Sequence, residues 1–379
     1  MKKLHIIISK GWHAQVANAY LIIKQQRESG ENIDVCCLIS SKIDQRLKKE
    51  GIVSRIFNFK HYNNPVAFLT FWKLLKKGDY QIVHLHGYNG KTRLWFACKF
   101  SRNRVPVICS SRDQPKPGFF FRRFFWTHFT HVLVPNQLVL SQLRSVAPCH
   151  SKMTVLNPPV DTNRFQPFPK KKNSSVKIGM FARFDAVKGY PIFFEACQIL
   201  RDTYNRSDFQ VIIGGTNFEI HRDTIDGLLE NYRLREITKV IGETVSIENE
   251  IAKLDIGVIA SVGSEELSRI ALEYMSCGVP VIATRVGGLP ECITFEEGGI
   301  VPPDNPHQLA NQLNELIDNP ELRQKKGAHG RKKALEQYSV QKHCERLERD
   351  FYSQPNKEVK SILAQQDIHS DLNENEIQI

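Results

Sequence analysis

Short apolar runs alternate with amphipathic helical patterns along nearly the whole chain, and this alternation restricts the fold more than any other feature. The series opens with LHIIIS at residues 4–9 and VANAYLIIKQQRESG at residues 16–30, where Gly30 ends the helical run. Strands that alternate with helices favour parallel sheets with helices on both faces. The sequence therefore predicts an α/β protein built on doubly wound sheets.

The alternation forms two series. In the first, we expect further strands in IDVCCLIS (33–40), VSRIFNF (53–59), IVHLHG (82–87), VPVICSS (105–111) and HVLVPN (131–136), with helices at 41–51, 64–78, around 92–101 and from Gln137. In the second, we expect strands in VKIGMFARF (176–184), FQVIIGG (209–215), ITKVIGE (237–243), IGVIAS (256–261), PVIAT (280–284) and GGIVPP (298–303), with helices at 190–204, 225–235, 247–255 and 264–276.

Residues 157–175 (NPPVDTNRFQPFPKKKNSS) are rich in proline and polar residues and lack periodicity, which predicts a linker. A length of 379 residues suits two domains. We therefore predict Rossmann-like domains at 1–165 and 176–340 that face a cleft, with a helix near 340–353 packing back on the first. The patternless polar residues 354–379 predict a disordered tail.

The net charge of +12 is unevenly distributed. Residues 1–170 hold 27 Lys and Arg against 8 Asp and Glu, a balance of +19, and the rest of the chain holds 25 against 32, a balance of −7. A basic half favours an anionic partner: nucleic acid, acidic lipid or a phosphorylated small molecule. Nine cysteines without a CxxC pair indicate reduced thiols. No apolar run is long enough to predict a transmembrane helix.

The common nucleotide-binding motifs are absent. The turn after the first expected strand is SKGWHAQV, with Gly11 alone in place of GxGxxG, and no GxxxxGK[ST] occurs. In the second series the first strand leads into FARFDAVKGY, where Arg183 and Lys188 precede a helix. Two cations beside a helix N-terminus suit a diphosphate, although two exposed surface charges are the plainer alternative.

The stretch SEELSRIALEYMSCGVPVIATRVGGLPE at residues 264–291 contains carboxylates on either side of an apolar helical pattern. Ser264 is expected to cap this helix, with Glu265 in its first turn and Glu273 about 12 Å further along the axis. That separation suits two contacts on one extended ligand. The alternative is that these carboxylates only solvate an exposed helix face. Apolar residues such as Leu272 and Met275 surround the helix, however, and leave it little surface for solvent.

These residues carry a family resemblance. RFDAVKG, followed by the 264–291 stretch and GGIVPP, resembles the nucleotide-sugar domain of glycosyltransferase family 4, whose members have the GT-B fold and retain anomeric configuration. LHIIISKGWHAQ resembles the family's first strand and glycine loop, IVHLHG its VHxH strand, and NPPVDTNRF its linker. The resemblance covers nearly the whole chain.

The resemblance implies a role for each matching residue. Arg183 and Lys188 would hold the donor diphosphate and stabilise the leaving nucleotide, and Glu265 would lie by the donor sugar. The amides of Leu267 and Ser268 would meet the diphosphate or sugar, Glu273 would accept from the ribose hydroxyls, and Gly11 would close over the phosphates. The residues predicted on this basis as catalytic are Glu265, Arg183, Lys188 and Asp113.

The sequence departs from the family pattern at some positions. His13 stands in the glycine loop, Glu266 replaces the commoner glycine, and Asp113, in SSRD, lies where relatives often have a histidine. His13, His86 and Asp113 are predicted on the acceptor side. His84 and His86 are two residues apart on one strand, so they fall on one face, where core or acceptor contacts are favoured over a metal. The resemblance implies no metal and no cofactor for transfer.

Residues 115–129 (PKPGFFFRRFFWTHF) combine arginines with seven Phe and Trp residues, which suits the headgroup region of an anionic bilayer. A buried helix with outward-reaching Arg122 and Arg123 is the alternative. No nucleic-acid recognition module matches, so nucleic acid is not expected as a partner.

We therefore expect a cytoplasmic enzyme, peripheral on the inner face of the cytoplasmic membrane. It would transfer a hexosyl or N-acetylhexosaminyl group from a nucleoside diphosphate sugar to a lipid-linked, lipopolysaccharide or surface-glycan acceptor. A soluble sugar-phosphate acceptor and a non-catalytic nucleotide-sugar-binding regulator are the alternatives.

Overall fold

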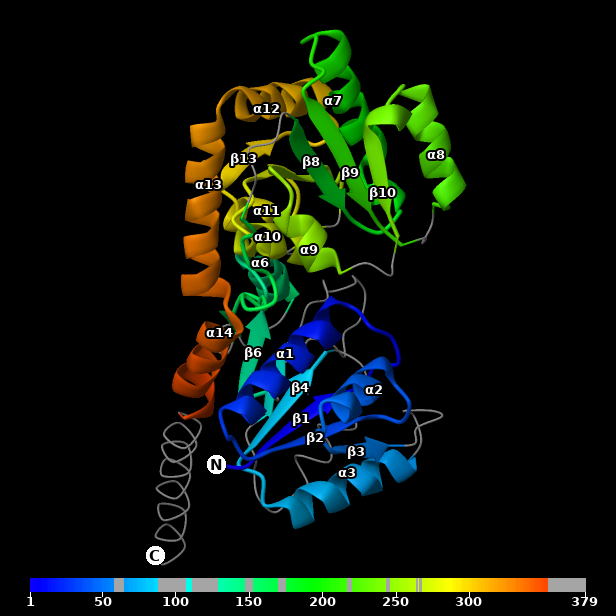
Figure 1. Ribbon diagram of the computed structural model, residues 1–379. Helices are drawn as coiled ribbons and strands as arrows, with labels where there is room; N and C mark the ends of the chain where they lie inside the picture. The colour runs from blue at the N-terminus through cyan, green and yellow to red at the C-terminus, as the bar shows by residue number, and fades with distance from the viewer. Residues whose placement is uncertain are drawn as a thin grey trace, which may run out of the picture. The chain divides into compact units, whose positions relative to one another are not determined.

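The structure is a computed structural model and describes residues 1–57, 65–87, 107–110, 129–146, 153–169, 175–216, 220–242, 246–263, 265 and 268–353 (Figure 1). The chain divides into two compact units. The first contains Met1–Val134, Gln142–Val155 and the C-terminal segment from His343, and the second contains Pro135–Ser141 and Leu156–Lys342. The division after Val155 lies about ten residues before the expected boundary at 165, and from His343 the chain belongs to the first unit.

The first unit is built on a seven-stranded parallel sheet. Its strands are β1 (Lys3–Ile7), β2 (Ile33–Leu38), β3 (Ser54–Phe57), β4 (Ile82–His86), β5 (Val107–Ser110), β6 (His131–Val134) and β7 (Met153–Val155). Its helices are α1 (Ala14–Glu28), α2 (Lys42–Lys49), α3 (Pro65–Gly78), the second half of α6 (Gln137–Val146), the larger part of α14 (Val340–Arg346) and the π-helical η6 (Leu347–Tyr352).

The second unit is built on a six-stranded parallel sheet. Its strands are β8 (Val176–Phe181), β9 (Phe209–Gly214), β10 (Thr238–Ile241), β11 (Ile256–Ile259), β12 (Val281–Thr284) and β13 (Gly298–Val301). Its helices are α7 (Tyr190–Asp202), α8 (Arg222–Asn231), α9 (Ile247–Ala252), α10 (Arg269–Ser276), α11 (Leu289–Cys292), α12 (Pro306–Asp318) and α13 (Pro320–Lys333), with the short helices η3 (Ala186–Lys188), η4 (Arg235–Ile237) and η5 (Ala334–Tyr338).

The two sheets share one strand order over six strands, and the first sheet has a seventh strand at its edge. The first runs β3-β2-β1-β4-β5-β6-β7 and the second β10-β9-β8-β11-β12-β13. In each, the order reverses beside the first strand, between β1 and β4 and between β8 and β11. This is the doubly wound arrangement that the alternation predicts, and ligands bind at such reversals, outside the carboxyl ends of the strands.

Helices cover both faces of the second sheet because its strands are apolar on both sides. In β9, Val211 and Ile213 pack into one buried cluster with α7, α8 and α12. Ile212 points to the opposite cluster, which includes residues of α9, α10 and α11. Both faces are therefore dry, as is typical of parallel sheets.

The part of the expected linker that the structure describes is packed rather than extended. Val160 and Phe165 are buried in the second unit's core, and Val160 forms a parallel bridge with Ser339. The carbonyl of Phe165 accepts a hydrogen bond from Ser276 Oγ at 2.7 Å. Proline content alone predicts a linker here, whereas these apolar side chains anchor the segment to one unit.

Several expectations lie outside the described residues: the helix around 92–101, most of the 115–129 segment and the tail at 354–379. The seven cysteines that the structure describes are buried, and no two of them are joined in a disulfide. Within the described part of the chain, no helix has the length and apolar character needed to cross a bilayer.

Candidate functional site

The loop after β8 places two predicted cations at the reversal point of the second sheet. Asp185 caps the short helix η3, since its side chain accepts a hydrogen bond from the Val187 amide at 3.2 Å. Gly189 then turns the chain into α7 with a φ of +74°. A Cβ atom at Gly189 would lie 2.0 Å from the Ala260 carbonyl oxygen, so glycine is required both by conformation and by space.

The loop after β11 supplies the partner of Lys188. The Lys188 ammonium forms an ion pair with Glu265 Oε1, and the same oxygen accepts a hydrogen bond from Ser261 Oγ at 2.8 Å. The Lys188 side chain is 16% exposed and that of Glu265 is 6% exposed. Removing one member of such a buried pair leaves the other charge uncompensated, which is costly.

Arg183 is more accessible. Its Nη2 donates to Asp185 Oδ2 at 3.1 Å, and its side chain is 51% exposed while that of Asp185 is buried. A guanidinium that is anchored by a buried carboxylate and open to solvent is placed to receive an anion.

The Gly-Gly pair of the 264–291 stretch fixes the backbone of Glu265. The Gly288 amide donates to the Glu265 carbonyl oxygen at 2.8 Å. Gly287 has a φ of +57°, and a Cβ atom there would lie 1.4 Å from the same oxygen. The glycines thus allow the turn after β12 to lie directly against the loop that presents the Glu265 carboxylate.

The helix that carries Glu273 is shorter than predicted. It begins at Arg269 with Ser268 at its N-cap, so Glu265 lies outside it, and the expected cap, Ser264, is outside the described residues. The separation of Glu265 and Glu273 is therefore not a rise along one helix axis. Ser268 is buried, and its side chain makes no capping hydrogen bond.

Glu273 is a buried carboxylate with cationic neighbours. Arg269 Nη2 donates to Glu273 Oε1 at 3.3 Å, and α10 packs Leu272 and Met275 into the core as predicted. Burial raises the pKa of Glu273, and the Arg269 and Arg164 guanidinium groups oppose that rise. Arg164 in turn pairs with Glu248 at 2.8 Å. Glu273 is thus a buried hydrogen-bond acceptor within a charged network.

In the first unit, Gly11 and His13 follow β1. The backbone of Gly11 has no positive φ, and no atom lies within 4 Å of a Cβ placed there, so the unliganded fold does not require glycine. His13 is exposed at the N-cap of α1, and its Nε2 lies 3.0 Å from Ser9 Oγ.

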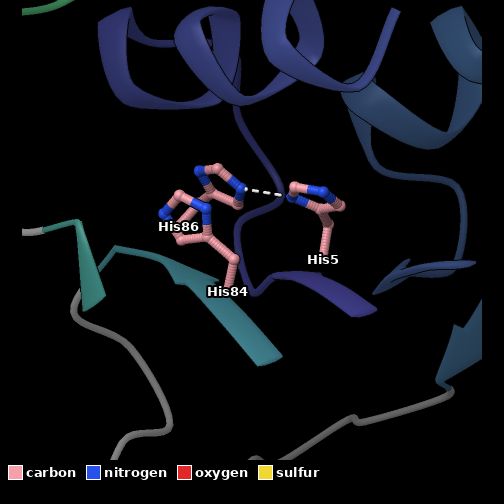
Figure 2. A group of neighbouring side chains, drawn as sticks. All are labelled: His5, His84 and His86. Atoms are coloured by element: carbon pink, nitrogen blue, oxygen red, sulfur yellow. Dashed lines mark hydrogen bonds between the residues drawn. The ribbon is translucent and has the colours of Figure 1, made fainter. Parts of the chain in front are cut away.

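His86 lies in a buried histidine cluster. It is 5% exposed, its Nε2 lies 2.9 Å from His5 Nδ1, and its ring stacks on His84 with the centroids 4.0 Å apart (Figure 2). This placement corresponds to the core alternative and leaves little surface for an acceptor to reach.

Two family models match the chain. The model of the glycosyl transferases group 1 matches residues 161–333, and that of glycosyltransferase family 4 matches residues 18–164. Together they cover both units. The chain belongs to glycosyltransferase family 4.

Curated relatives of this glycosyltransferase match it in part. A D-inositol 3-phosphate glycosyltransferase of Streptomyces bingchenggensis is 24% identical over 74% of the chain and 68% of its own length. A GDP-mannose-dependent monoacylated alpha-(1-6)-phosphatidylinositol monomannoside mannosyltransferase of Corynebacterium glutamicum is 28% identical over 58% of the chain and 61% of its own length. For a D-inositol 3-phosphate glycosyltransferase of Paenarthrobacter aurescens, 28% identical, the match spans 46% of each chain.

Solved structures share the whole fold of the glycosyltransferase. A glycosyltransferase of Rickettsia africae superposes with a TM-score of 0.80, covering 94% of this chain and 98% of its own, at 19% identity. HepE of Anabaena, solved in complex with UDP, superposes with a TM-score of 0.79, covering 93% of this chain and 100% of its own, at 18% identity. The GT-B architecture expected from the sequence is thus confirmed.

The structure of the glycosyltransferase thus brings some predicted site residues together. Lys188 pairs with Glu265, while Arg183 and Glu273 pair with Asp185 and Arg269. Leu267 and Asp113 lie outside the described residues, as do Ser264 and Glu266.

Sequence reasoning missed Ser261, Arg269 and His5. Ser261 ends the IGVIAS run four residues before Glu265, which is a usable signal in retrospect. His5 gives no such signal, because nothing in LHIIIS reveals that its strand lies beside IVHLHG.

Proposed function

We propose that this chain transfers a sugar from a nucleoside diphosphate donor to a lipid-linked or surface-glycan acceptor, with retention of anomeric configuration and without a metal ion in the transfer step. The observation that carries the proposal lies at the β8/β11 reversal, where the loop before α7 holds two ion pairs, Lys188 with Glu265 and Arg183 with Asp185. Two cations and a helix N-terminus suit a diphosphate.

The leaving diphosphate gains negative charge as the bond to the sugar breaks, and preorganised cations stabilise that charge. The Lys188 ammonium has three donor hydrogens, so it can keep its bond to Glu265 while it donates to a phosphate oxygen. Arg183, half exposed on its Asp185 anchor, can donate to a second oxygen. Ser261, which donates to Glu265 Oε1 at 2.8 Å, would help to orient this carboxylate toward the donor sugar.

Glu273 would accept hydrogen bonds from the ribose hydroxyls, and Gly11 would allow close approach of the phosphates. With water excluded, the acceptor hydroxyl would attack the anomeric carbon on the face from which the nucleotide departs, and the departing phosphate would accept the hydroxyl proton. The UDP in complex with HepE of Anabaena supports a nucleotide donor, and the donor base remains to be chosen by experiment.

Replacing Lys188 or Arg183 with alanine is expected to lower turnover at least about 100-fold, as does the loss of other charge-stabilising groups. Lys239→Ala is the matched control, because Lys239 is an exposed lysine of the same unit on β10. Donor candidates come from thermal-shift screening against a panel of nucleoside diphosphate sugars, because binding to the folded state raises the melting temperature. Near-normal turnover in both alanine variants contradicts the assignment, and absence of any transfer or donor hydrolysis by the wild type favours a non-catalytic regulator.

The acceptor is proposed from charge and from the relatives. The basic first half of the chain suits an anionic membrane surface, and the mannosyltransferase of Corynebacterium glutamicum is named for a phosphatidylinositol mannoside. Location at the cytoplasmic face of the membrane is part of the same proposal.

A soluble sugar-phosphate acceptor is the second candidate, since the D-inositol 3-phosphate glycosyltransferase matches more of the chain. Co-sedimentation with vesicles that contain phosphatidylglycerol distinguishes the two. Binding that weakens with added salt supports the lipid-linked acceptor, and no binding supports the soluble one.

A further inference from the structure

Three histidine side chains meet on one face of the first unit's sheet. Strands β1 and β4 are neighbours, and their register places His5 opposite His84 and Ile7 opposite His86. Because side chains two residues apart fall on the same face of a strand, all three imidazoles share one face. One ring nitrogen from each lies within 4.8 Å of the others, and Figure 2 shows the rings converging.

The cluster is dry and its members are neutral. Burial, together with the smaller effect of the Lys3 charge, lowers the pKa of His5 to about 3. Burial also lowers the pKa of His84 and His86 well below the ordinary value, helped by the neighbouring histidines, His343 included. Neutral imidazole is the form that binds transition metals, so these side chains are ready to act as ligands at neutral pH.

Hydrogen bonds within the protein do not use the full capacity of the cluster. His5 Nε2 is buried and has no hydrogen bond of ordinary geometry among the described residues. Gln26 on α1 is close enough to favour the protonated form of His5, yet both polar atoms of its side-chain amide are likewise buried and unbonded within the described part of the chain. Buried polar atoms without partners are uncommon, and here they include the His5 ring nitrogen that does not contact His86.

His84 is held in place as metal ligands usually are. Its Nδ1 lies 2.6 Å from the Tyr352 hydroxyl and its Nε2 lies 2.8 Å from Ser110 Oγ. Ligating histidines commonly bond an oxygen through the nitrogen that does not bind the metal. His84 can release one of these contacts and keep the other.

One nearby positive charge opposes a cation, but it is compensated. Lys3 is buried, and its ammonium lies over the Tyr352 ring, 4.8 Å from the centroid. The same ammonium forms ion pairs with Glu31 and Glu348. These two carboxylates leave the local charge near or below zero.

We propose that His5, His84 and His86 form a binding site for one divalent transition metal ion of the zinc class, made of other residues than the Lys188–Glu265 cluster of the second unit. Zinc–nitrogen bonds of about 2.0–2.1 Å place tetrahedral ligand nitrogens roughly 3.3 Å apart. The 2.9 Å contact between His5 and His86 is close to that separation, and modest ring movement brings in His84.

The ligand set favours zinc over the hard cations. Three imidazoles and no carboxylate suit zinc, copper or nickel, whereas magnesium and calcium prefer oxygen ligands. The bound ion joins β1 to β4 and, through the contact of His84 with Tyr352, the C-terminal helix η6 to the sheet. Its function is therefore structural.

The test uses the full chain, stripped with a chelator and titrated with zinc ions alone. Calorimetry and native mass spectrometry are expected to show one ion per chain. The melting temperature is expected to rise by about 5–10 °C at a zinc concentration a hundredfold above the dissociation constant. Cobalt(II) in place of zinc is expected to give a ligand-field spectrum without the strong thiolate absorption that cysteine ligands produce.

Variants assign the ligands. His5→Phe and His86→Asn are each expected to weaken zinc binding at least about 100-fold, since the loss of even an outer-shell partner costs up to that much. His221→Asn is the matched control, because His221 is an exposed histidine at the start of α8 whose side chain makes no capping bond. If a variant folds poorly, the wild-type cobalt spectrum decides.

Three outcomes overturn the proposal: no stoichiometric zinc binding by the wild type, a cobalt spectrum dominated by thiolate, or unchanged zinc affinity in folded His5→Phe and His86→Asn. Any of these leaves the cluster as a neutral hydrogen-bonded core.

Discussion

The two units have the same strand order around their reversal points but opposite chemistry there. In the second unit the polar residues follow the strands: Lys188 comes after β8, and Ser261 and Glu265 come after β11. In the first unit the histidines lie inside the strands, His5 within β1 and His86 at the end of β4. The reversal point of the second unit therefore has paired charges in its loops, whereas that of the first unit has neutral imidazoles within its strands.

This difference shows what topology decides and what it leaves open. A doubly wound sheet determines which strand ends are neighbours, and so which residues can meet. Whether those residues are charged depends on whether helices bury them on the face of the sheet. A side chain beyond the strand end can keep its charge by pairing with an opposite charge, whereas an imidazole within a covered strand loses its hydration and stays neutral.

The largest expected effect is on the pH dependence of stability. The folded-state pKa values of His5, His84 and His86 lie below the unfolded value near 6.5, so the unfolded chain binds more protons as pH falls through that value. The stability present above pH 6.5 is therefore lost below it, by about 1.4 kcal/mol per histidine at pH 5.5, or roughly 4 kcal/mol in all for the metal-free first unit.

Hydrogen exchange at pH 7.5 and 5.5, corrected for intrinsic rates, measures the stability of each unit by its own strands. Peptides from β1 and β4 are expected to lose protection, while those from β8 and β11 change less. In His5→Phe, the slope of unfolding free energy against pH is expected to fall by the equivalent of one proton. The charges of Lys3 and His343 nearby are present in both proteins and do not remove this difference. Equal losses in both units contradict the contrast drawn between them.

The next largest effect concerns the loops at the reversal point of the second unit. Gly287→Ala introduces a Cβ atom that meets the Glu265 carbonyl at a positive φ, so we expect a loss of about 2–3 kcal/mol in unfolding free energy and weakened donor binding. Thermal unfolding and donor titration measure the two effects.

Gly227→Ala is the matched control for this change. Gly227 lies in α8, has no positive φ and has no atom within 4 Å of the position that a Cβ would take, so alanine there is expected to stabilise the protein by about 0.5–1 kcal/mol. If Gly287→Ala behaves like this control, the close approach of the two loops is wrong.

The smallest effect concerns the orientation of Glu265. Ser261→Ala removes the 2.8 Å hydrogen bond to its carboxylate, so turnover is expected to fall about tenfold while donor affinity changes little. Steady-state kinetics separate the two quantities. Ser246→Ala is the control, because Ser246 is exposed and its side chain makes no capping bond. An unchanged turnover in Ser261→Ala means that Lys188 alone positions the carboxylate.

Most of the fold could be predicted from local pattern. The periodicity of runs such as FQVIIGG and YPIFFEACQILRDTY reflects which faces must be buried, and the structure has β9 and α7 there. Strand β7 (Met153–Val155) was missed because three residues are too few to show a period. The 157–175 segment is predicted as a linker because its proline content is a stronger local signal than the isolated apolar residues Val160 and Phe165. These two residues are buried through contacts with α13 and η5, which are distant in the sequence.

The candidate site divides in the same way. The involvement of Lys188, Glu265 and Glu273 is implied by residue type and family motif, and it is independent of exact helix bounds. The start of α10 at Arg269 rather than near Ser264 was not predicted, because the turn after β12 bonds to the Glu265 carbonyl and holds that residue outside the helix.

By itself, the sequence determined the alternation of strands and helices, the separation of charge between the halves and the residues that mark the family, since each depends on neighbours along the chain. Only the tertiary structure decided that Lys188 meets Glu265, that Gly287 lies against that loop, and that His5 joins His84 and His86. Those contacts join residues about 20 to 80 positions apart in the chain, and their ionisation and geometry depend on burial, which no local pattern contains.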